Sequence, residues 1–339
     1  MSDTAQGAGT RTAGCAALRR AGRYAIASSV VAGIFLSIAA TSQAAEATAA
    51  SSTARIQALL DSPVNGIVNL PRGTFTVRPD LRLRHGERIV GHRTTLVVAS
   101  GSGNYRAMFA GASDTTDLSG LTVTGVTFDQ NAAGNPIRRA TSLFKGTPRF
   151  VVLMVAGSDL RIINDRFIGS DDLNTIVTGV GTSNVTISNN SFKTRNKLMH
   201  DHSTIYTGGI GTVIRHNTFT GTAMVDSAAI EVHGDRASIT SNHVSGYYRA
   251  ANIIASDTRF TGNHVSGAAN PVELWSFAPT ALRHVAVSGN VLNRHLAYWR
   301  GLLARHGLSL APAKYTRQVI RNPASPLPFY NIAVHDNRG

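Results

Sequence analysis

The chain has 339 residues, which is enough for two ordinary domains or one long solenoid. Glycine is frequent, at 32 residues, and aromatic residues make up only 6%, so short strands with tight turns fit the composition better than a helical bundle. The formal net charge of +14 favours an acidic partner, and the single cysteine, Cys15, excludes an intrachain disulfide.

Residues 1–44 have the order of a secretory signal. Four arginines precede an uncharged apolar run over residues 24–40, and Ser42-Gln43-Ala44 supplies the small residues of a cleavage site. We therefore predict a signal peptide over residues 1–44 and a secreted or periplasmic protein with no stable membrane span after cleavage. An uncleaved N-terminal anchor is the alternative, although the run is marginal for spanning a bilayer. Cleavage after Ala44 removes four arginines and one aspartate and lowers the formal net charge from +14 to +11.

The mature chain opens with two segments of different character. Residues 45–53 are rich in Ala, Ser and Thr, so we predict a flexible linker there. Residues 54–60 have apolar side chains at helical spacing and predict a short helix. Such a helix would cover the open end of a β-stack, whose unpaired edge is otherwise an aggregation hazard. One domain is predicted over residues 54–339.

Residues 184–265 contain four copies of a single pattern: apolar, x, apolar, x, x, Asn, x, apolar. The copies read NVTISNNSF, GTVIRHNTF, ASITSNHV and TRFTGNHV, and their Asn residues lie 21–27 positions apart. A repeat this short cannot bury an apolar face alone, so stacked neighbours must bury it together. Less regular copies on both sides bring the number of recognisable copies to eight.

The repeated Asn predicts a ladder of identical side chains. Asn tolerates the left-handed backbone conformation of a tight turn, and its amide hydrogen-bonds to the next coil. We expect these residues to be structural, and the Phe or Val two residues later to stack in the core. The aligned positions are Val126, Asp165, Asn190, Asn217, Asn242, Asn263, Asn290 and Asn337.

The last two copies are unusually far apart. Asn290 and Asn337 are separated by 47 positions, which predicts an insertion over about residues 294–330. Within it, residues 295–306 (HLAYWRGLLARH) have apolar side chains at helical spacing. We expect an amphipathic helix there, packed on the side or end of the stack.

The segments GIVNLPRGTFTV (residues 66–77) and GERIVG (residues 86–91), followed by the Asn repeats, resemble right-handed parallel β-helix proteins of the pectate-lyase-like superfamily. The resemblance covers about residues 66–293. It implies an all-β, single-stranded right-handed parallel β-helix with an N-terminal helical cap and a C-terminal insertion that contains a helix. It also implies a secreted protein that acts on or binds polysaccharide.

Alignment by the ladder Asn predicts one row of polar residues. Tyr206, Glu231 and Asn252 each lie eleven residues before a ladder Asn, on successive coils about 4.8 Å apart. His233 shares the strand face of Glu231, whereas the residues on either side of Glu231 would point inward. An apolar core does not require a Glu-x-His pair on the outside of a sheet. We therefore place the candidate site here, with an ordinary solvated sheet face as the alternative.

The chemistry that this row favours is proton abstraction at C5 of a uronate, by a lyase or an epimerase. Such a reaction needs a base, a cation opposite the substrate carboxylate and an acid. His233 or His202 would be the base, oriented by Glu231 or Asp201, and Tyr206 the base or the acid. The candidate catalytic residues are Asp201, His202, Tyr206, Glu231, His233 and Arg249, and the candidate substrate-binding residues are Arg195, Lys197, Tyr247, Tyr248, Asn252 and Trp275. Core packing is the alternative for the two tyrosines and the tryptophan.

Two alternative functions stay open. Glu231 with Asp201 would form the carboxylate pair of a glycoside hydrolase, or the same scaffold would bind polysaccharide without catalysis. The cofactor is unknown; calcium is one candidate, at the adjacent acids Asp171 and Asp172, and the His-Asp-His segment over residues 200–202 is a candidate for zinc. The expected partner is an acidic polysaccharide and not a nucleic acid, because no aromatic–basic motif occurs. The oligomeric state is left open.

Overall fold

The computed structural model describes residues 43–102, 105–136, 151–170, 174–194, 202–222, 227–276, 281–305, 309, 319–321, 325 and 327–339. The chain divides into two compact units, Met1–Thr48 and Ala49–Gly339, and the described strands all belong to the second. Within the described ranges, no helix is both long and apolar enough to cross a bilayer.

The second unit is built from two large sheets. The 17-stranded sheet contains β1 (Ile67–Leu70), β2 (Gly73–Val77), β4 (Arg88–Val98), β6 (Thr122–Asp129), β8 (Arg161–Ile163), β9 (Arg166–Ser170), β11 (Thr186–Ser188), β12 (Ser191–Thr194), β14 (Val213–Arg215), β15 (Thr218–Thr220), β17 (Ser238–Thr240), β18 (His243–Ser245), β20 (Arg259–Thr261), β21 (His264–Ala268), β23 (Leu282–Ser288), β24 (Val291–Arg294) and β26 (Phe329–His335). The nine-stranded sheet contains β3 (Leu81–Arg82), β5 (Ala107–Ala110), β7 (Val151–Val155), β10 (Asn174–Thr178), β13 (His202–Thr207), β16 (Ser227–Val232), β19 (Arg249–Ile253), β22 (Asn270–Leu274) and β25 (Val319–Arg321).

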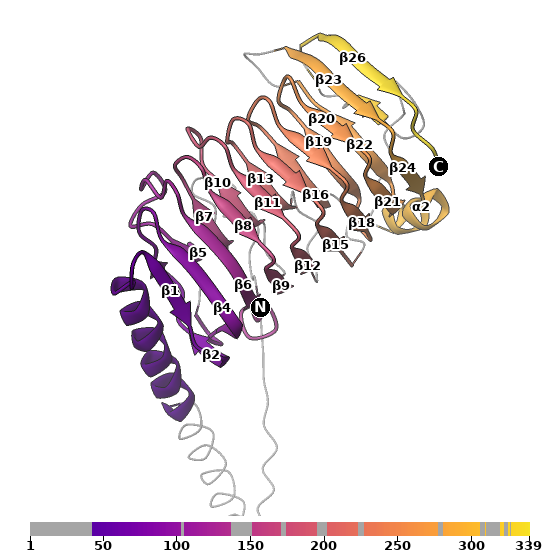
Figure 1. Cartoon of the computed structure of the whole chain (residues 1–339). Coiled ribbons are helices and arrows are strands. Elements are labelled where there is room, and N and C mark those ends of the chain that lie inside the picture. Colours follow the sequence, from indigo (N-terminus) through magenta and orange to yellow (C-terminus); the bar gives the residue numbers. More distant parts are fainter. Residues whose placement is uncertain are drawn as a thin grey trace, which may run out of the picture. The chain divides into compact units, whose positions relative to one another are not determined.

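Three strands make up each regular coil of this parallel β-helix (Figure 1). The chain passes through β8, β9 and β10 and then through β11, β12 and β13, and each strand pairs in parallel with its counterpart one coil away. The nine-stranded sheet takes one strand from each coil, in chain order from β3 to β25. Equivalent side chains of successive coils therefore form rows along the stack, as the short repeat predicted.

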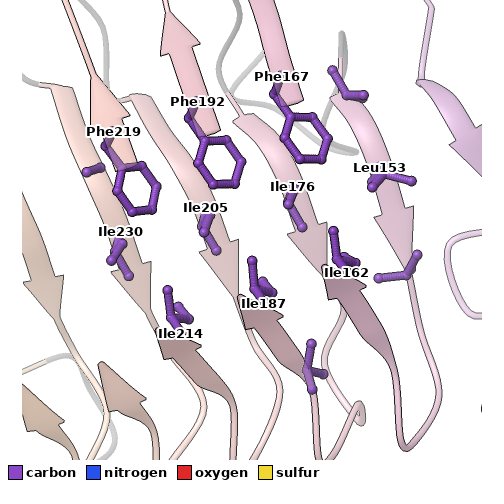
Figure 2. Packing of buried hydrophobic residues seen from close by; sticks show 14 of the residues in the cluster. Leu153, Ile162, Phe167, Ile176, Ile187, Phe192, Ile205, Ile214, Phe219 and Ile230 are labelled. Carbon is purple, nitrogen blue, oxygen red and sulfur yellow. The ribbon is translucent and has the colours of Figure 1, made fainter. Parts of the chain in front are cut away.

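The core consists of like side chains stacked in such rows (Figure 2). The ring centroids of Phe128, Phe167, Phe192 and Phe219 are 5.2, 4.8 and 4.7 Å apart in succession, and the ring planes are close to parallel. Isoleucine residues from successive coils form further rows beside the rings. The predicted stacking of the residue two positions after the ladder Asn is confirmed.

The predicted ladder of Asn side chains is also confirmed. The backbone N–H and Nδ2 of Asn190 donate to Oδ1 of Asn217, at 2.9 and 3.1 Å. Asn217 in turn donates to Oδ1 of Asn242, and its Nδ2 also reaches the carbonyl oxygen of Ile187 at 2.9 Å. The same contacts continue along the stack to Asn337. Each buried amide therefore has its partners in the neighbouring coils, which satisfies the requirement of buried polar groups.

One detail of the ladder prediction is wrong. The residue in the left-handed conformation is the one before each ladder Asn: Asn189, His216 and Ser241 have φ values of 56°, 54° and 55°. The ladder Asn turns its side chain inward to bond along the stack, so the preceding, more exposed residue makes the turn. Any residue that tolerates a positive φ suffices at that position, which is why it varies from coil to coil.

The N-terminal helix is longer than predicted. Residues 43–61 are helical, so the prediction of a flexible linker over residues 45–53 is wrong. The alanine-rich composition that suggested a linker also has high helix propensity. Ala49, Ile56 and Leu60 are buried, and Oγ1 of Thr53 accepts a hydrogen bond from the backbone N–H of Arg78 at 2.7 Å. Residues 49–61 thus cap the first coil, as expected of residues 54–60.

The predicted insertion contains both a helix and a strand. Helix α2 (Leu296–Ala304) is held by Trp299, which is fully buried and donates from Nε1 to the carbonyl oxygen of Gly267 at 2.7 Å. Strand β25 also lies in this segment and pairs with β22. The insertion over residues 294–330 is therefore interrupted by a strand that continues the nine-stranded sheet. The rest of the predicted helix, beyond Arg305, lies outside the described residues.

Candidate functional site

The predicted row of polar residues lies on the nine-stranded sheet. The register pairs Tyr206 of β13 with Glu231 of β16, and Glu231 with Asn252 of β19. The row continues to Glu273 of β22, which is paired with Asn252. The residues on either side of Glu231 are fully buried in the core, as predicted. Tyr206, Glu231, Asn252 and Glu273 therefore point away from that core on four successive coils.

Glu273 was not predicted from the sequence, because it does not have the spacing that the other members of the row share. Glu273 lies 17 residues before its ladder Asn, Asn290, instead of eleven, since the chain between β22 and β24 is longer than in earlier coils. A different signal was present. The segment Val272-Glu273-Leu274 repeats the pattern of Ile230-Glu231-Val232, an acid between two core residues.

Glu231 and His233 form a hydrogen-bonded pair. Nε2 of His233 lies 2.8 Å from Oε1 of Glu231, and Oγ of Ser203 donates to Oε2 of the same carboxylate. The side chain of Glu231 is 10% exposed and that of His233 is 31% exposed. A carboxylate only accepts, so in the neutral imidazole the proton sits on Nε2 and Nδ1 is the basic nitrogen. The ring of Tyr206 lies over His233, with 4.6 Å between centroids.

The environment of Glu231 keeps this carboxyl ionised. Burial raises its pKa, but the hydrogen bond and charge of His233, the hydroxyl of Ser203 and the charge of Arg249 more than offset burial, so the pKa lies below its ordinary value. A carboxylate that stays ionised at neutral pH is suited to orienting a histidine. It is poorly suited to donating a proton as a general acid.

Arg249 is paired with a carboxylate of the row. Its Nε lies 2.5 Å from Oε2 of Glu273, and the two side chains are 14% and 4% exposed. Its guanidinium also lies over the ring of Tyr248, 4.9 Å from the centroid. The ion pair links β19 to β22, and the carboxylate of Glu273 neutralises the charge of Arg249. In the role predicted for it, opposite a substrate carboxylate, Arg249 would thus have to bind the carboxylates of both Glu273 and the substrate.

Asn252 lies in the row between the two acids. It is 4% exposed, and its Oδ1 has no hydrogen-bond partner among the described residues. A buried acceptor without a donor is costly, and such atoms in native proteins usually meet a water or a ligand.

The structure decides between the two alternatives for the predicted stacking residues. Tyr247 is fully buried, and its hydroxyl lies 3.1 and 2.8 Å from Oγ1 of Thr194 and Thr204, so it packs in the core and does not stack on a sugar. Tyr248 is 6% exposed and packs edge to face against Trp299. The turn before β19 directs Tyr247 inward and Tyr248 to α2. Trp275 is partly exposed and stays a predicted sugar contact.

Several candidates lie outside the described residues. Asp171, Asp172, Arg195, Lys197 and Asp201 belong to this group, so the calcium site and these roles stay predictions. His202 begins β13, in register with Ser227 of β16, although its side chain is not described. In the part of the chain that the structure describes, no three His, Cys, Asp or Glu residues are placed to hold a metal ion.

Comparisons with known proteins support the fold. No protein-family model matches the chain, and no curated protein matches its sequence. A mutant tailspike protein of Escherichia coli bacteriophage HK620 in complex with a hexasaccharide superposes with a TM-score of 0.61 at 15% identity, over 84% of this chain and 52% of the tailspike chain. A further mutant, in complex with a pentasaccharide, gives a TM-score of 0.59 at 14% identity with the same coverage. The A-module of the Azotobacter vinelandii mannuronan C-5 epimerase AlgE4 gives 0.38 at 13% identity, over 84% of this chain and 92% of the module.

The similarity to the tailspike proteins, together with the parallel sheets, places the chain among the right-handed parallel β-helix proteins, as the resemblance in the sequence implied. The chain spans about half the length of the tailspike chains that it matches. At such low identity the likeness concerns the fold, and function must be argued from the site.

Proposed function

We propose that this protein is a polysaccharide-active enzyme in which His233, held by Glu231, removes the C5 proton of a uronate in an acidic polysaccharide. The observation that carries the proposal is the 2.8 Å contact between the ionised carboxylate of Glu231 and Nε2 of a partly exposed His233. The net charge, +14 for the whole chain and +11 after the predicted cleavage, and the oligosaccharides bound to the tailspike proteins of the same fold support an acidic glycan as the substrate. Export through the predicted signal peptide is part of the proposal.

The chemistry assigns a step to each group. Nδ1 of His233 takes the proton from C5, and the electron pair left on carbon is delocalised into the adjacent carboxylate. In a lyase the pair then forms the C4–C5 double bond, the C4–O bond breaks and the leaving oxygen takes a proton, for which Tyr206 is the nearest phenol in the row. In an epimerase a proton returns to the opposite face of C5 and no bond to oxygen breaks. Arg249, Arg195 and Lys197 are the proposed cations for the uronate carboxylate.

A panel of substrates tests this proposal. The purified protein would be incubated with polygalacturonate, alginate, a glycosaminoglycan and neutral dextran. Ultraviolet absorbance reports unsaturated uronate, a reducing-end assay reports chain cleavage, and NMR of the polymer reports epimerisation. We expect unsaturated or epimerised uronate from at least one acidic polymer and no product from dextran. If no polymer is changed, the proposal is wrong, and binding of polysaccharide without catalysis is the alternative that is left.

A second candidate is glycoside hydrolysis by Glu231 and Glu273. The two carboxylates belong to one row and are separated by two coils, about 9.6 Å at the usual strand spacing. Carboxyl groups of inverting hydrolases lie about 6.5–9.5 Å apart. Both acids are engaged, Glu231 by His233 and Glu273 by Arg249, which favours orienting roles over proton donation. Reducing ends formed without ultraviolet absorbance would establish this candidate.

A further inference from the structure

The outer surface of the 17-stranded sheet carries a second feature, which the candidate site does not use. From β8 to β24 the strands of this sheet contain no Asp or Glu, within the described residues that form them. They do contain exposed cations and histidines on successive coils. We call this set the basic strip; its members are Arg161, Arg166, Lys193, Arg215, His243, Arg259 and His264.

The backbone fixes the direction in which these side chains point. Arg215 is exposed and follows the fully buried Ile214, and Lys193 is exposed and follows the buried Phe192. Since neighbouring residues of a strand point to opposite faces, the strip lies on the outer face. The sheet strands of successive coils lie side by side (Figure 1), so the strip extends along the stack from β8 to β21.

The cations of the strip are not neutralised locally. No arginine or lysine of the strip forms an ion pair with a described acid. Asp129 of β6, one coil before β9, ends the acid-free region on the N-terminal side. Asp159, Asp235 and Asp257 lie in the turns before β8, β17 and β20. Asp257 pairs with His284 outside the strip at 3.1 Å, and the other two accept hydrogen bonds from Asn184 and Ser256. A surface with this unmatched charge raises the local concentration of anions.

The spacing of the strip suits an extended polymer. Each coil from β8 to β21 contributes one or two members, and coils repeat at about 4.8 Å. The phenylalanines of these strands, Phe167, Phe192, Phe219 and Phe260, are all buried, so among the described residues of the strip only the imidazoles of His243 and His264 offer exposed rings to a nucleobase. Cations spread over the strands on both sides of the ladder turn, with Ser and Thr between them, fit an anionic polysaccharide better than a nucleic acid.

We propose that the basic strip is a second binding surface, which holds an anionic polysaccharide along the 17-stranded sheet, away from the candidate site on the nine-stranded sheet. Binding releases counterions that are condensed on the polymer. Because this release is less favourable at high salt, the affinity of the strip for the polymer falls as the salt concentration rises. The proposal does not depend on catalysis, because binding to this surface requires no product.

Charge reversal on adjacent coils tests the strip. Lys193→Glu with Arg215→Glu removes the two central cations, whereas Arg72→Glu with Arg305→Glu changes the net charge equally at exposed positions outside the strip. Binding of polygalacturonate would be measured at low and moderate salt, with dextran and single-stranded DNA as comparison ligands. Thermal unfolding of both variants would show that they are folded.

We expect the strip variant to bind polygalacturonate about tenfold more weakly at low salt, with a shallower salt dependence, and the control variant to bind within about twofold of the wild type. Dextran should not bind, and DNA should bind more weakly than polygalacturonate. Equal losses in both variants would show that net charge alone is responsible and overturn the strip. Tighter binding of DNA would overturn the choice of partner. A negative result in the product assay would leave this measurement unaffected.

Discussion

Asp165 is the one acid in the described part of the ladder. Its Oδ1 accepts from the backbone N–H of Val126 at 2.8 Å, in the manner of a ladder Asn, and its own N–H donates to Asn190 at 2.8 Å. Its Oδ2 is buried without a partner, at the place where a ladder Asn carries its NH₂ group. Burial raises its pKa well above the ordinary value, opposed only by the backbone N–H groups of Val126 and Ile163. A protonated Asp165 would have an O–H to donate where Asn has an N–H.

Replacement of Asp165 by Asn is expected to stabilise the protein at neutral pH. Because the pKa of Asp165 is higher in the folded state, its contribution to stability is present below the unfolded value, about 3.9, and is lost as pH rises towards the folded value. Asp165→Asn should therefore gain about 1–3 kcal/mol at pH 7, and the gain should shrink towards pH 4. Urea unfolding at both pH values checks this. Asp159→Asn, at an exposed turn, is the control and should change little at either pH.

Ser203 shows how a residue without charge sets the state of the site. Its hydroxyl donates to Glu231 and helps hold the pKa of that carboxyl below the ordinary value. Ser203→Ala should raise the pKa of Glu231, as seen in a carboxyl carbon NMR titration. The lowered pKa of Glu231 in the folded state stabilises the protein at a pH above the pKa of the unfolded state. The substitution should therefore also reduce stability at neutral pH. An unchanged titration would show that His233 and Arg249 suffice.

At the scale of elements, the coil is stabilised by contacts between like residues. Phe192 stacks between Phe167 and Phe219 at 4.8 and 4.7 Å, so each ring is packed by the coil before it and the coil after it. Helix α2 behaves differently, because its buried Trp299 and Leu303 anchor it beside Tyr248. Tyr248 in turn lies under Arg249, so the insertion supports one side of the candidate site.

A cavity in the phenylalanine row should affect more than one coil. Phe192→Ala is expected to lower the free energy of unfolding by about 3–5 kcal/mol, because the ring is fully enclosed. Phe192→Leu, which retains most of the volume, should cost considerably less. Urea unfolding of the two variants measures the difference, and a loss below about 1 kcal/mol for the alanine variant would contradict a rigid stack.

At the scale of the whole molecule, the sequence predicts what every coil must repeat. The ladder Asn and the Phe rows recur because a stack needs the same side chain in each layer, and aligning them also placed Tyr206, Glu231 and Asn252 in one row. Features that occur in one coil only could not be predicted from the repeat. Glu273 was not predicted because its coil is longer than the others. The prediction of a linker over residues 45–53 was wrong because an alanine-rich segment is compatible with both a linker and a helix. The direction of Tyr247 depends on a turn that its own sequence does not specify.

The central claim is that Glu231 and His233 form a catalytic pair for proton abstraction. The most direct test is the rate of unsaturated or epimerised uronate formation by His233→Ala, compared with His335→Ala at an exposed position near the C-terminus. We expect the rate to fall about 10²–10⁴-fold in His233→Ala and to stay unchanged in the control. A wild-type rate in His233→Ala, with the protein folded, would contradict it.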